Sequence, residues 1–326
     1  MCYCSSWDSE TNDMTKEMID TLYEQIKDVE LESIVFAGIG EPSFSKNFLY
    51  ATQKFKDFKL EITSNGLVSP GKTDILCNYF DKIIISVDGI DEDYYKMRNA
   101  SFENLLSTLR IIKDYKYKNN TKVPNVEFAF VLTKSNKDTL FDFVNLARDY
   151  NADKILVSHL LPGNEEQVKD IFYTRYENKE GKDFAHKINN YSYYGNRIIM
   201  SLPYMEIKTD RVCPFIDKEY TYIDYLGNVI PCYRYSNEYD EYVFGRKKRV
   251  LKHSFGNISK DTLKNVYNSN EYQNFRTSVE LNKFPSCVDC DLQDGCSFID
   301  TTECDCLSYE PTCGDCLWNR NIIRCT

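Results

Sequence analysis

The fold class is decided by a short apolar stretch, Lys82-Ile83-Ile84-Ile85-Ser86-Val87. Its continuous hydrophobic character is typical of a strand buried on both faces, as in the middle of a parallel sheet. Four more stretches of extended character lie at residues 33–36, 60–63, 126–132 and 154–158. Helical periodicity separates these strands, at residues 18–26, 46–55, 74–80, 102–115 and 138–150. Five strands alternating with helices predict a parallel α/β sheet built from right-handed crossovers.

Composition limits the possible partners and the compartment. The chain has 326 residues, a net charge of −10 and thirteen cysteines. Its length allows one large core and a smaller module, so we expect two domains. The negative charge argues against non-specific binding to nucleic acid or to a membrane surface, because both are anionic. The sequence shows no export signal or membrane-length apolar stretch, which favours a cytoplasmic location. In a reducing cytosol cysteines are interpreted first as metal ligands.

The second half of the chain is less regular. Residues 163–212 are rich in Asn, Tyr and charged residues, and we interpret them as a connector with some helix. A hairpin is predicted at residues 220–232, where Gly227 supplies the positive φ that its turn needs. A helix is predicted at residues 262–276, followed by loops rich in cysteine.

Cysteines dominate the last third of the sequence. They stand at Cys213, Cys232, Cys287, Cys290, Cys296, Cys304, Cys306, Cys313, Cys316 and Cys325. Two thiolates separated by two residues can converge on one metal, and a region poor in regular structure needs such a link to order its backbone. Ten thiolates exceed what one tetrahedral site can use, so either two iron–sulfur clusters or two structural zinc ions are implied.

The spacing of these cysteines resembles that of the SPASM domain, the auxiliary-cluster module of many radical SAM enzymes. The resemblance lies in Cys213-x13-Gly227-x4-Cys232 and in Cys287-x2-Cys290-x5-Cys296. The family often continues with a cysteine where this chain has Asp300, and Cys304 or Cys306 can serve instead. The resemblance implies one cluster on Cys287, Cys290 and Cys296 with a late cysteine. It implies a second on Cys213 and Cys232 with Cys306 and one of Cys313 or Cys316.

Three loops at the carboxyl ends of predicted strands carry polar residues. Ile39-Gly40-Glu41-Pro42 resembles the GGEP motif of radical SAM enzymes, in which the loop grips the amino group of S-adenosylmethionine. Thr63-Ser64-Asn65-Gly66 and Ser86-Val87-Asp88-Gly89 follow two other strands, at the rim where ligands of α/β barrels gather. Taken singly, each loop is equally well explained as turn chemistry that ends a strand. Together they predict that the cofactor is bound by Gly40, Glu41, Pro42, Ser64, Asn65, Ser86 and Asp88.

The cluster motif of the radical SAM family, CxxxCxxC, is incomplete in this sequence. We expect Cys2 to be its third cysteine, with the first barrel strand and two ligands lying upstream, and the chain as written to be inactive. The implied fold is a partial (β/α)6 radical SAM barrel lacking its first strand, joined to a small SPASM domain. The expected boundaries are 1–162 for the barrel, 163–212 for the connector and 213–326 for the SPASM domain.

Motifs along most of the chain resemble one subgroup, the radical SAM maturases associated with tungsten-containing aldehyde ferredoxin oxidoreductases. Among them are Cys232-Tyr-Arg234, Phe244-Gly-Arg-Lys-Lys-Arg249 and Phe284-Pro-Ser-Cys-Val-Asp-Cys290. The resemblance implies a SAM-binding [4Fe–4S] cluster, up to two auxiliary clusters, and cleavage of S-adenosylmethionine to a 5′-deoxyadenosyl radical. Implied partners are ferredoxin or flavodoxin as reductant, and the tungsten oxidoreductase or its pterin cofactor.

Several alternatives stay open. The chain could instead be a SPASM peptide maturase that makes thioether or carbon–carbon crosslinks, or a zinc-stabilised binding protein. The basic run from Arg246 to Lys252 could clamp an anionic substrate, or it could be a solvated loop. His159 could be a proton donor, a substrate contact or the capped end of a strand.

Overall fold

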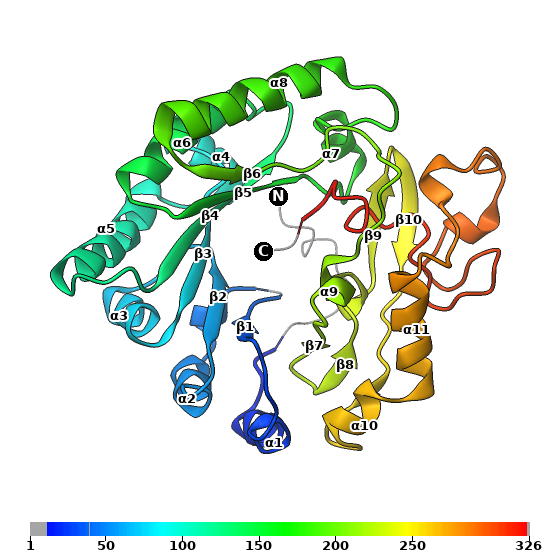
Figure 1. The fold of residues 1–326 in the computed structure, drawn as a ribbon, viewed down its shortest axis with the longest axis horizontal. Coiled ribbons are helices and arrows are strands. Elements are labelled where there is room, and N and C mark those ends of the chain that lie inside the picture. The colour runs from blue at the N-terminus through cyan, green and yellow to red at the C-terminus, as the bar shows by residue number, and fades with distance from the viewer. Residues whose placement is uncertain (1–11, 39, 325–326) are drawn as a thin grey trace.

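The computed structural model describes residues 12–38 and 40–324 (Figure 1). Its centre is a six-stranded sheet whose strands lie in sequence order and pair in parallel throughout. The strands are β1 (Ile34–Phe36), β2 (Leu60–Ser64), β3 (Lys82–Ser86), β4 (Asn125–Leu132), β5 (Lys154–His159) and β6 (Ile199–Ser201). This arrangement confirms the predicted α/β class. The expectation that a barrel strand is missing before β1 concerns residues outside the described ranges.

Helices cover the outer side of the curved sheet, and the C-terminal region faces its inner side (Figure 1). They are α1 (Lys16–Ile26), α2 (Phe48–Lys54), α3 (Pro70–Tyr79), α4 (Asp91–Arg98), α5 (Phe102–Lys118), α6 (Thr139–Asp149) and α8 (Lys179–Asn190). The short helix α7 (Glu165–Lys169) lies instead beside β9 (Tyr239–Val243) (Figure 1). Polar residues fix where several of the helices begin. Thr15 accepts a hydrogen bond from the amide of Met18, and Asn178 accepts one from the amide of Gly181.

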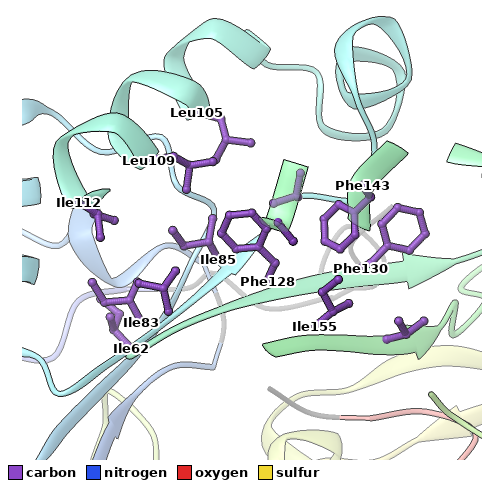
Figure 2. Close-up of a cluster of buried hydrophobic side chains, with 14 of the residues drawn as sticks. Ile62, Ile83, Ile85, Leu105, Leu109, Ile112, Phe128, Phe130, Phe143 and Ile155 are labelled. Carbon is purple, nitrogen blue, oxygen red and sulfur yellow. The ribbon is translucent and has the colours of Figure 1, made fainter. Parts of the chain in front are cut away.

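The main core lies between the sheet and its outer helices (Figure 2). Side chains alternate along a strand, so Ile83 and Ile85 of β3 point into this core while Ile84 lines the inner side of the sheet. On the helix side, α5 contributes Leu105 and Leu109 at a helical spacing. Burying each of these side chains stabilises the fold by roughly 2 kcal/mol.

The sheet continues into the stretch that the sequence analysis interpreted as a connector. Strand β6 pairs with β5 in the register Lys154↔Ile199, after α8 and a π-helical turn at Tyr191–Gly195. The strand has three residues and lies in the short apolar run Ile198-Ile199-Met200, which the sequence analysis left inside the connector because Asn, Tyr and charged residues surround it.

The C-terminal region contains, within the described residues, two small antiparallel sheets and three α-helices. Its elements are α9 (Pro214–Asp217), β7 (Tyr222–Ile223), β8 (Asn228–Ile230), β9 (Tyr239–Val243), β10 (Arg246–Val250), β11 (Gly256–Asn257), α10 (Leu263–Tyr267) and α11 (Asn270–Glu280). The sheets are β7–β8–β11 and the β9–β10 hairpin. Where the sequence predicted one helix, Ser269 begins a second one by accepting a hydrogen bond from the amide of Tyr272.

The predicted hairpin is confirmed as β7 and β8. Gly227 has φ +81°, and a side chain there would lie 2.7 Å from the sulfur of Met18 on α1. The carboxylate of Asp224 accepts hydrogen bonds from the amides of Leu226 (3.0 Å) and Asn228 (2.9 Å). The turn is therefore fixed by its own side chain, and it brings the C-terminal region against α1.

No helix in the described ranges has the length and apolar character needed to cross a membrane.

Candidate functional site

The loop after β1 is tied to the loop after β2 through the carboxylate of Glu41. Its Oε1 atom accepts hydrogen bonds from the amide of Ser43 (3.2 Å) and the hydroxyl of Ser64 (3.0 Å). Its Oε2 atom accepts one from the amide of Asn65 at 2.6 Å. The structure therefore brings together residues predicted from two separate motifs, at the carboxyl-end rim of the sheet.

The β1 loop also approaches the C-terminal region closely. Gly38 has φ +107°, and a Cβ atom there would lie 2.7 Å from the hydroxyl of Tyr222 on β7. A larger residue at Gly38 would be strained and would push β7 away. Of the other predicted loop residues, Gly40 is exposed with φ +88°, and Pro42 begins a 3₁₀ turn, Pro42–Phe44.

Ser86 and Asp88 follow from β3, and they lie in different environments. Ser86 is half-buried at the end of the strand, whereas Asp88 is buried with φ +65°. One carboxylate oxygen of Asp88 accepts a hydrogen bond from the amide of Val131 (2.7 Å), and the other pairs with Arg98 at 2.5 Å. The Asp88 carboxylate thus joins β3 to β4 and α4, so both of its oxygens are bound by the protein itself.

A cavity of about 1000 Å³ separates the inner side of the sheet from β7 and the residues on either side of it. Inward-facing side chains of the strands line it, together with Tyr220 and Tyr222 from the opposite side. At the amino ends of the strands the lining is charged. Lys82 of β3 lies 3.1 Å from Glu61 of β2 and 3.8 Å from Glu127 of β4. The two ends of the sheet therefore differ, with paired charges at one end and the Glu41 hydrogen bonds at the other.

His159 lies at the end of β5 but is buried against Tyr173, with the ring centroids 5.0 Å apart. Its Nε2 atom donates to the carbonyl oxygen of Tyr204 (3.1 Å). Burial lowers the pKa of the imidazole to about 3, so the ring is neutral near pH 7. The structure therefore favours the interpretation of His159 as the capped end of a strand over its interpretation as a proton donor.

Four cysteines from three segments surround one small cavity of about 20 Å³ inside the C-terminal region. They are Cys213, Cys232, Cys313 and Cys316. Burial raises the pKa of Cys213 to about 11, and it raises the pKa of the other three as well. Nearby thiols add to this effect, because two thiolates repel each other in a buried space. Thiolates in this set therefore need a cation between them, and their donor chemistry fits an iron–sulfur cluster.

The remaining described C-terminal cysteines lie in a separate segment, residues 287–306, beside this cavity. Cys287 is half-buried, and a Cβ at Gly314 would lie 2.6 Å from its sulfur. Burial raises its pKa to about 12, with contributions from Asp315 and Cys306. Cys296 and Cys304 are half-buried, whereas Cys290 and Cys306 are exposed.

The grouping of the cysteines differs in part from the predicted one. Cys313 and Cys316 both join Cys213 and Cys232, whereas Cys306 is outside that lining and interacts with Cys287. Cys2 and Cys325, which were also predicted as ligands, lie outside the described residues. Within the described ranges no three Cys, His, Asp or Glu side chains meet closely enough for a single metal ion. Cys77 is buried in the main core, apart from both groups.

A buried ionic network that the sequence analysis missed adjoins the four cysteines. Asp315 stands between Cys313 and Cys316 and pairs with three cations, at 2.5 Å from Arg246, 3.1 Å from Lys248 and 3.7 Å from Arg234. Arg234 also pairs with Glu241. Arg246–Val250 of the basic run therefore form strand β10, and the solvated-loop interpretation is wrong for the buried Lys248 and for its partly buried neighbour Arg246. The sequence did contain a signal for this network, because Arg234 and Asp315 stand within two positions of a cysteine.

Comparison with known proteins gives consistent results. The radical SAM superfamily matches residues 1–147, and the SPASM iron–sulfur cluster-binding domain matches residues 213–291. The tungsten-containing aldehyde ferredoxin oxidoreductase cofactor-modifying protein of Pyrococcus furiosus is 34% identical over 342 aligned residues. That alignment covers 100% of this chain and 92% of the relative.

Solved structures share the fold at low sequence identity. SuiB of Streptococcus suis with its precursor peptide SuiA has a TM-score of 0.62 and 14% identity, over 97% of this chain and 72% of that one. The enzyme anSMEcpe with AdoMet and the Kp18Cys peptide has a TM-score of 0.59 and 16% identity, over 95% and 88%. The chain therefore belongs to the radical SAM enzymes with a SPASM domain, in the family of the tungsten-containing aldehyde ferredoxin oxidoreductase cofactor-modifying protein, and its cofactors are iron–sulfur clusters and S-adenosylmethionine.

Proposed function

We propose that this enzyme cleaves S-adenosylmethionine reductively and uses the resulting 5′-deoxyadenosyl radical to mature the tungstopterin cofactor of an aldehyde ferredoxin oxidoreductase, or that host enzyme. The observation that carries this proposal is the similarity to the Pyrococcus furiosus cofactor-modifying protein, which extends over the full chain. Ferredoxin or flavodoxin is the proposed reductant.

In this proposal the rim of the sheet holds the amino-acid end of S-adenosylmethionine. Glu41 supplies a carboxylate for its ammonium group, and the donors from Ser64 and Asn65 fix the orientation of that carboxylate. Gly40 and Pro42 shape the loop, since one has a positive φ and the other begins a turn. Glu41 is half-buried, whereas Asp88 is buried and bound by Val131 and Arg98, so the proposed contact of Asp88 with the ribose would compete with these two partners.

The cysteines divide into three proposed ligand groups. Cys2 belongs to the SAM-binding cluster. The four cysteines around the small cavity hold one auxiliary cluster. Cys287, Cys290 and Cys296 hold the other, completed by Cys304, Cys306 or Cys325. Bound clusters supply electron transfer, while the protein excludes water and fixes the distance between the reacting groups.

The proposal is tested by anaerobic reconstitution with iron and sulfide. Because this chain has an incomplete CxxxCxxC motif, the test uses protein extended at its start so that the motif is complete. The protein is then reduced in the presence of S-adenosylmethionine, with and without the apo form of the tungsten oxidoreductase and its pterin. We expect release of 5′-deoxyadenosine that increases when pterin and apoenzyme are added. Release that neither addition changes would contradict the role in tungstopterin maturation. A protein that binds neither iron nor S-adenosylmethionine would contradict the radical chemistry as well.

A further inference from the structure

Arg234 occupies an unusual position for a charged residue. It follows Cys232 by two residues, in the 3₁₀ turn Tyr233–Ser236, and only 2% of its surface is exposed. It lines the same small cavity as the four cysteines. A guanidinium this deeply buried is stable only when its charge and its N–H groups find partners.

The partners of Arg234 are incomplete. Its Nε atom lies 3.3 Å from Glu241, which also binds Nη2, and Nη2 lies 3.7 Å from Asp315. In the described part of the chain, the buried Nη1 atom has no hydrogen-bond partner. Leaving such a donor unpaired is unfavourable, so an acceptor is expected on the Nη1 side.

Arg234 shares its cavity with the sulfur atoms of the four cysteines, which are candidate acceptors, as are the sulfur atoms of the cluster that they would hold. Sulfur atoms of thiolate-bound clusters accept hydrogen bonds from neighbouring N–H groups.

The ion pairs around Arg234 add further positive potential at the cavity. Three cations, Arg234, Arg246 and Lys248, are balanced by two anions, Glu241 and Asp315, which leaves one net positive charge beside the cavity. In a buried site this charge is weakly screened.

We propose that Arg234 donates a hydrogen bond from Nη1 to a sulfur of the auxiliary cluster held by Cys213, Cys232, Cys313 and Cys316, and that it thereby raises the reduction potential of that cluster. This inference rests on the auxiliary cluster of the proposed function. Reduction adds one electron to the cluster and breaks no bond. Because the reduced cluster carries more negative charge, a cation and a donor stabilise it more than they stabilise the oxidised cluster. Arg234 thus makes this cluster a better electron acceptor.

The test is a potentiometric titration of the reconstituted full chain, with dithionite as reductant and electron paramagnetic resonance as readout. The signal of this cluster is the one that Cys313→Ala removes. Arg234→Met deletes both the charge and the donor, so the midpoint should move to a more negative value. Arg234→Lys keeps the charge without the donor geometry and should give a smaller shift in the same direction. Glu241→Gln removes an anion, so the midpoint should move to a more positive value.

Lys247→Met is the matched control. Lys247 is a cation on β10, between Arg246 and Lys248 of the network, but its side chain is 60% exposed and pairs with Asp240. Its replacement should leave the midpoint unchanged. If Arg234→Met does not retain the cluster, Glu241→Gln decides the question by the sign of its shift.

Unchanged midpoints in variants with full iron content would overturn the inference, as would shifts of the same sign for Arg234→Met and Glu241→Gln. Loss of the cluster in every network variant would also overturn it, because the network would then serve assembly alone. If the wild-type protein and the Cys313→Ala variant give the same signals, this result would instead contradict the auxiliary cluster of the proposed function.

Discussion

The Glu41 loops and the four-cysteine cavity solve the problem of buried polar groups in opposite ways. The Glu41 carboxylate accepts three hydrogen bonds from its own chain, so its negative charge is stabilised before any ligand arrives. The four thiols lie together around one small cavity, where burial and neighbouring thiols raise the pKa of Cys232 and Cys313, and Arg234 beside them has an unpaired donor among the described residues. The barrel site is therefore organised by the protein, whereas the cysteine site is completed by what it binds.

Removal of iron should separate the two regions most strongly. We expect amides of the C-terminal elements, such as β8 and α11, to lose about a thousandfold in protection against hydrogen exchange when the clusters are stripped, because ligand binding stabilises only the folded domain. Strands β3 and β4 should keep their protection, and hydrogen-exchange mass spectrometry of loaded and stripped protein measures both. Equal loss of protection in the two regions would remove the distinction.

Replacement of Glu41 probes the organised site. Glu41→Gln should weaken binding of S-adenosylmethionine by about 30-fold, because a charge-assisted interaction is worth about 2 kcal/mol. Calorimetric titration of the reconstituted protein measures this, and Glu32→Gln, an exposed carboxylate in the loop before β1, is the control. Iron content should stay unchanged in both variants. Wild-type affinity in Glu41→Gln would contradict the proposed role of the loop.

The amino ends of the strands offer a third kind of polar site, in which charges pair without any ligand. Lys82→Met leaves Glu61 and Glu127 with 10% and 12% of their side chains exposed and without their shared cation. We expect a loss of about 1–2 kcal/mol in the free energy of unfolding, measured in urea, with no change in iron content. Lys59→Met should cost less, since Lys59 is 49% exposed and lies 3.9 Å from Glu61. A loss of iron in Lys82→Met would show that the two regions are coupled.

The smallest effect is expected at Glu206, an acidic side chain near β6. Hydrogen bonds from Lys182 and from the amide of Asn178 lower its pKa to about 2. Because the folded pKa lies below the ordinary value, the stabilisation is complete above about pH 4.5 and is lost as the pH falls towards 2. Glu206→Gln should lower stability by less than about 1 kcal/mol at pH 7, with a smaller difference at pH 3. A difference that grows at low pH would contradict this assignment.

The sequence predicted the sheet well because the central strands are buried on both faces of the sheet. Such strands are continuous apolar runs in the sequence, as at Ile83–Ile85. It predicted the Glu41, Ser64 and Asn65 loops because each follows a strand directly. It missed β10, because a run of basic residues is typical of a solvated loop. The partner that buries them, Asp315, lies about seventy positions away in the sequence. The grouping of Cys313 and Cys316 with Cys213 and Cys232 likewise depends on tertiary packing that no spacing records.

The central claim is that the four-cysteine cavity is completed by an iron–sulfur cluster. Mössbauer spectroscopy and iron analysis of the anaerobically reconstituted chain test it directly, with Cys313→Ser compared against Cys77→Ser, a buried cysteine in the main core. We expect Cys313→Ser to lose the iron of one cluster and Cys77→Ser to lose none. Equal iron content and identical spectra in the two variants would contradict the claim.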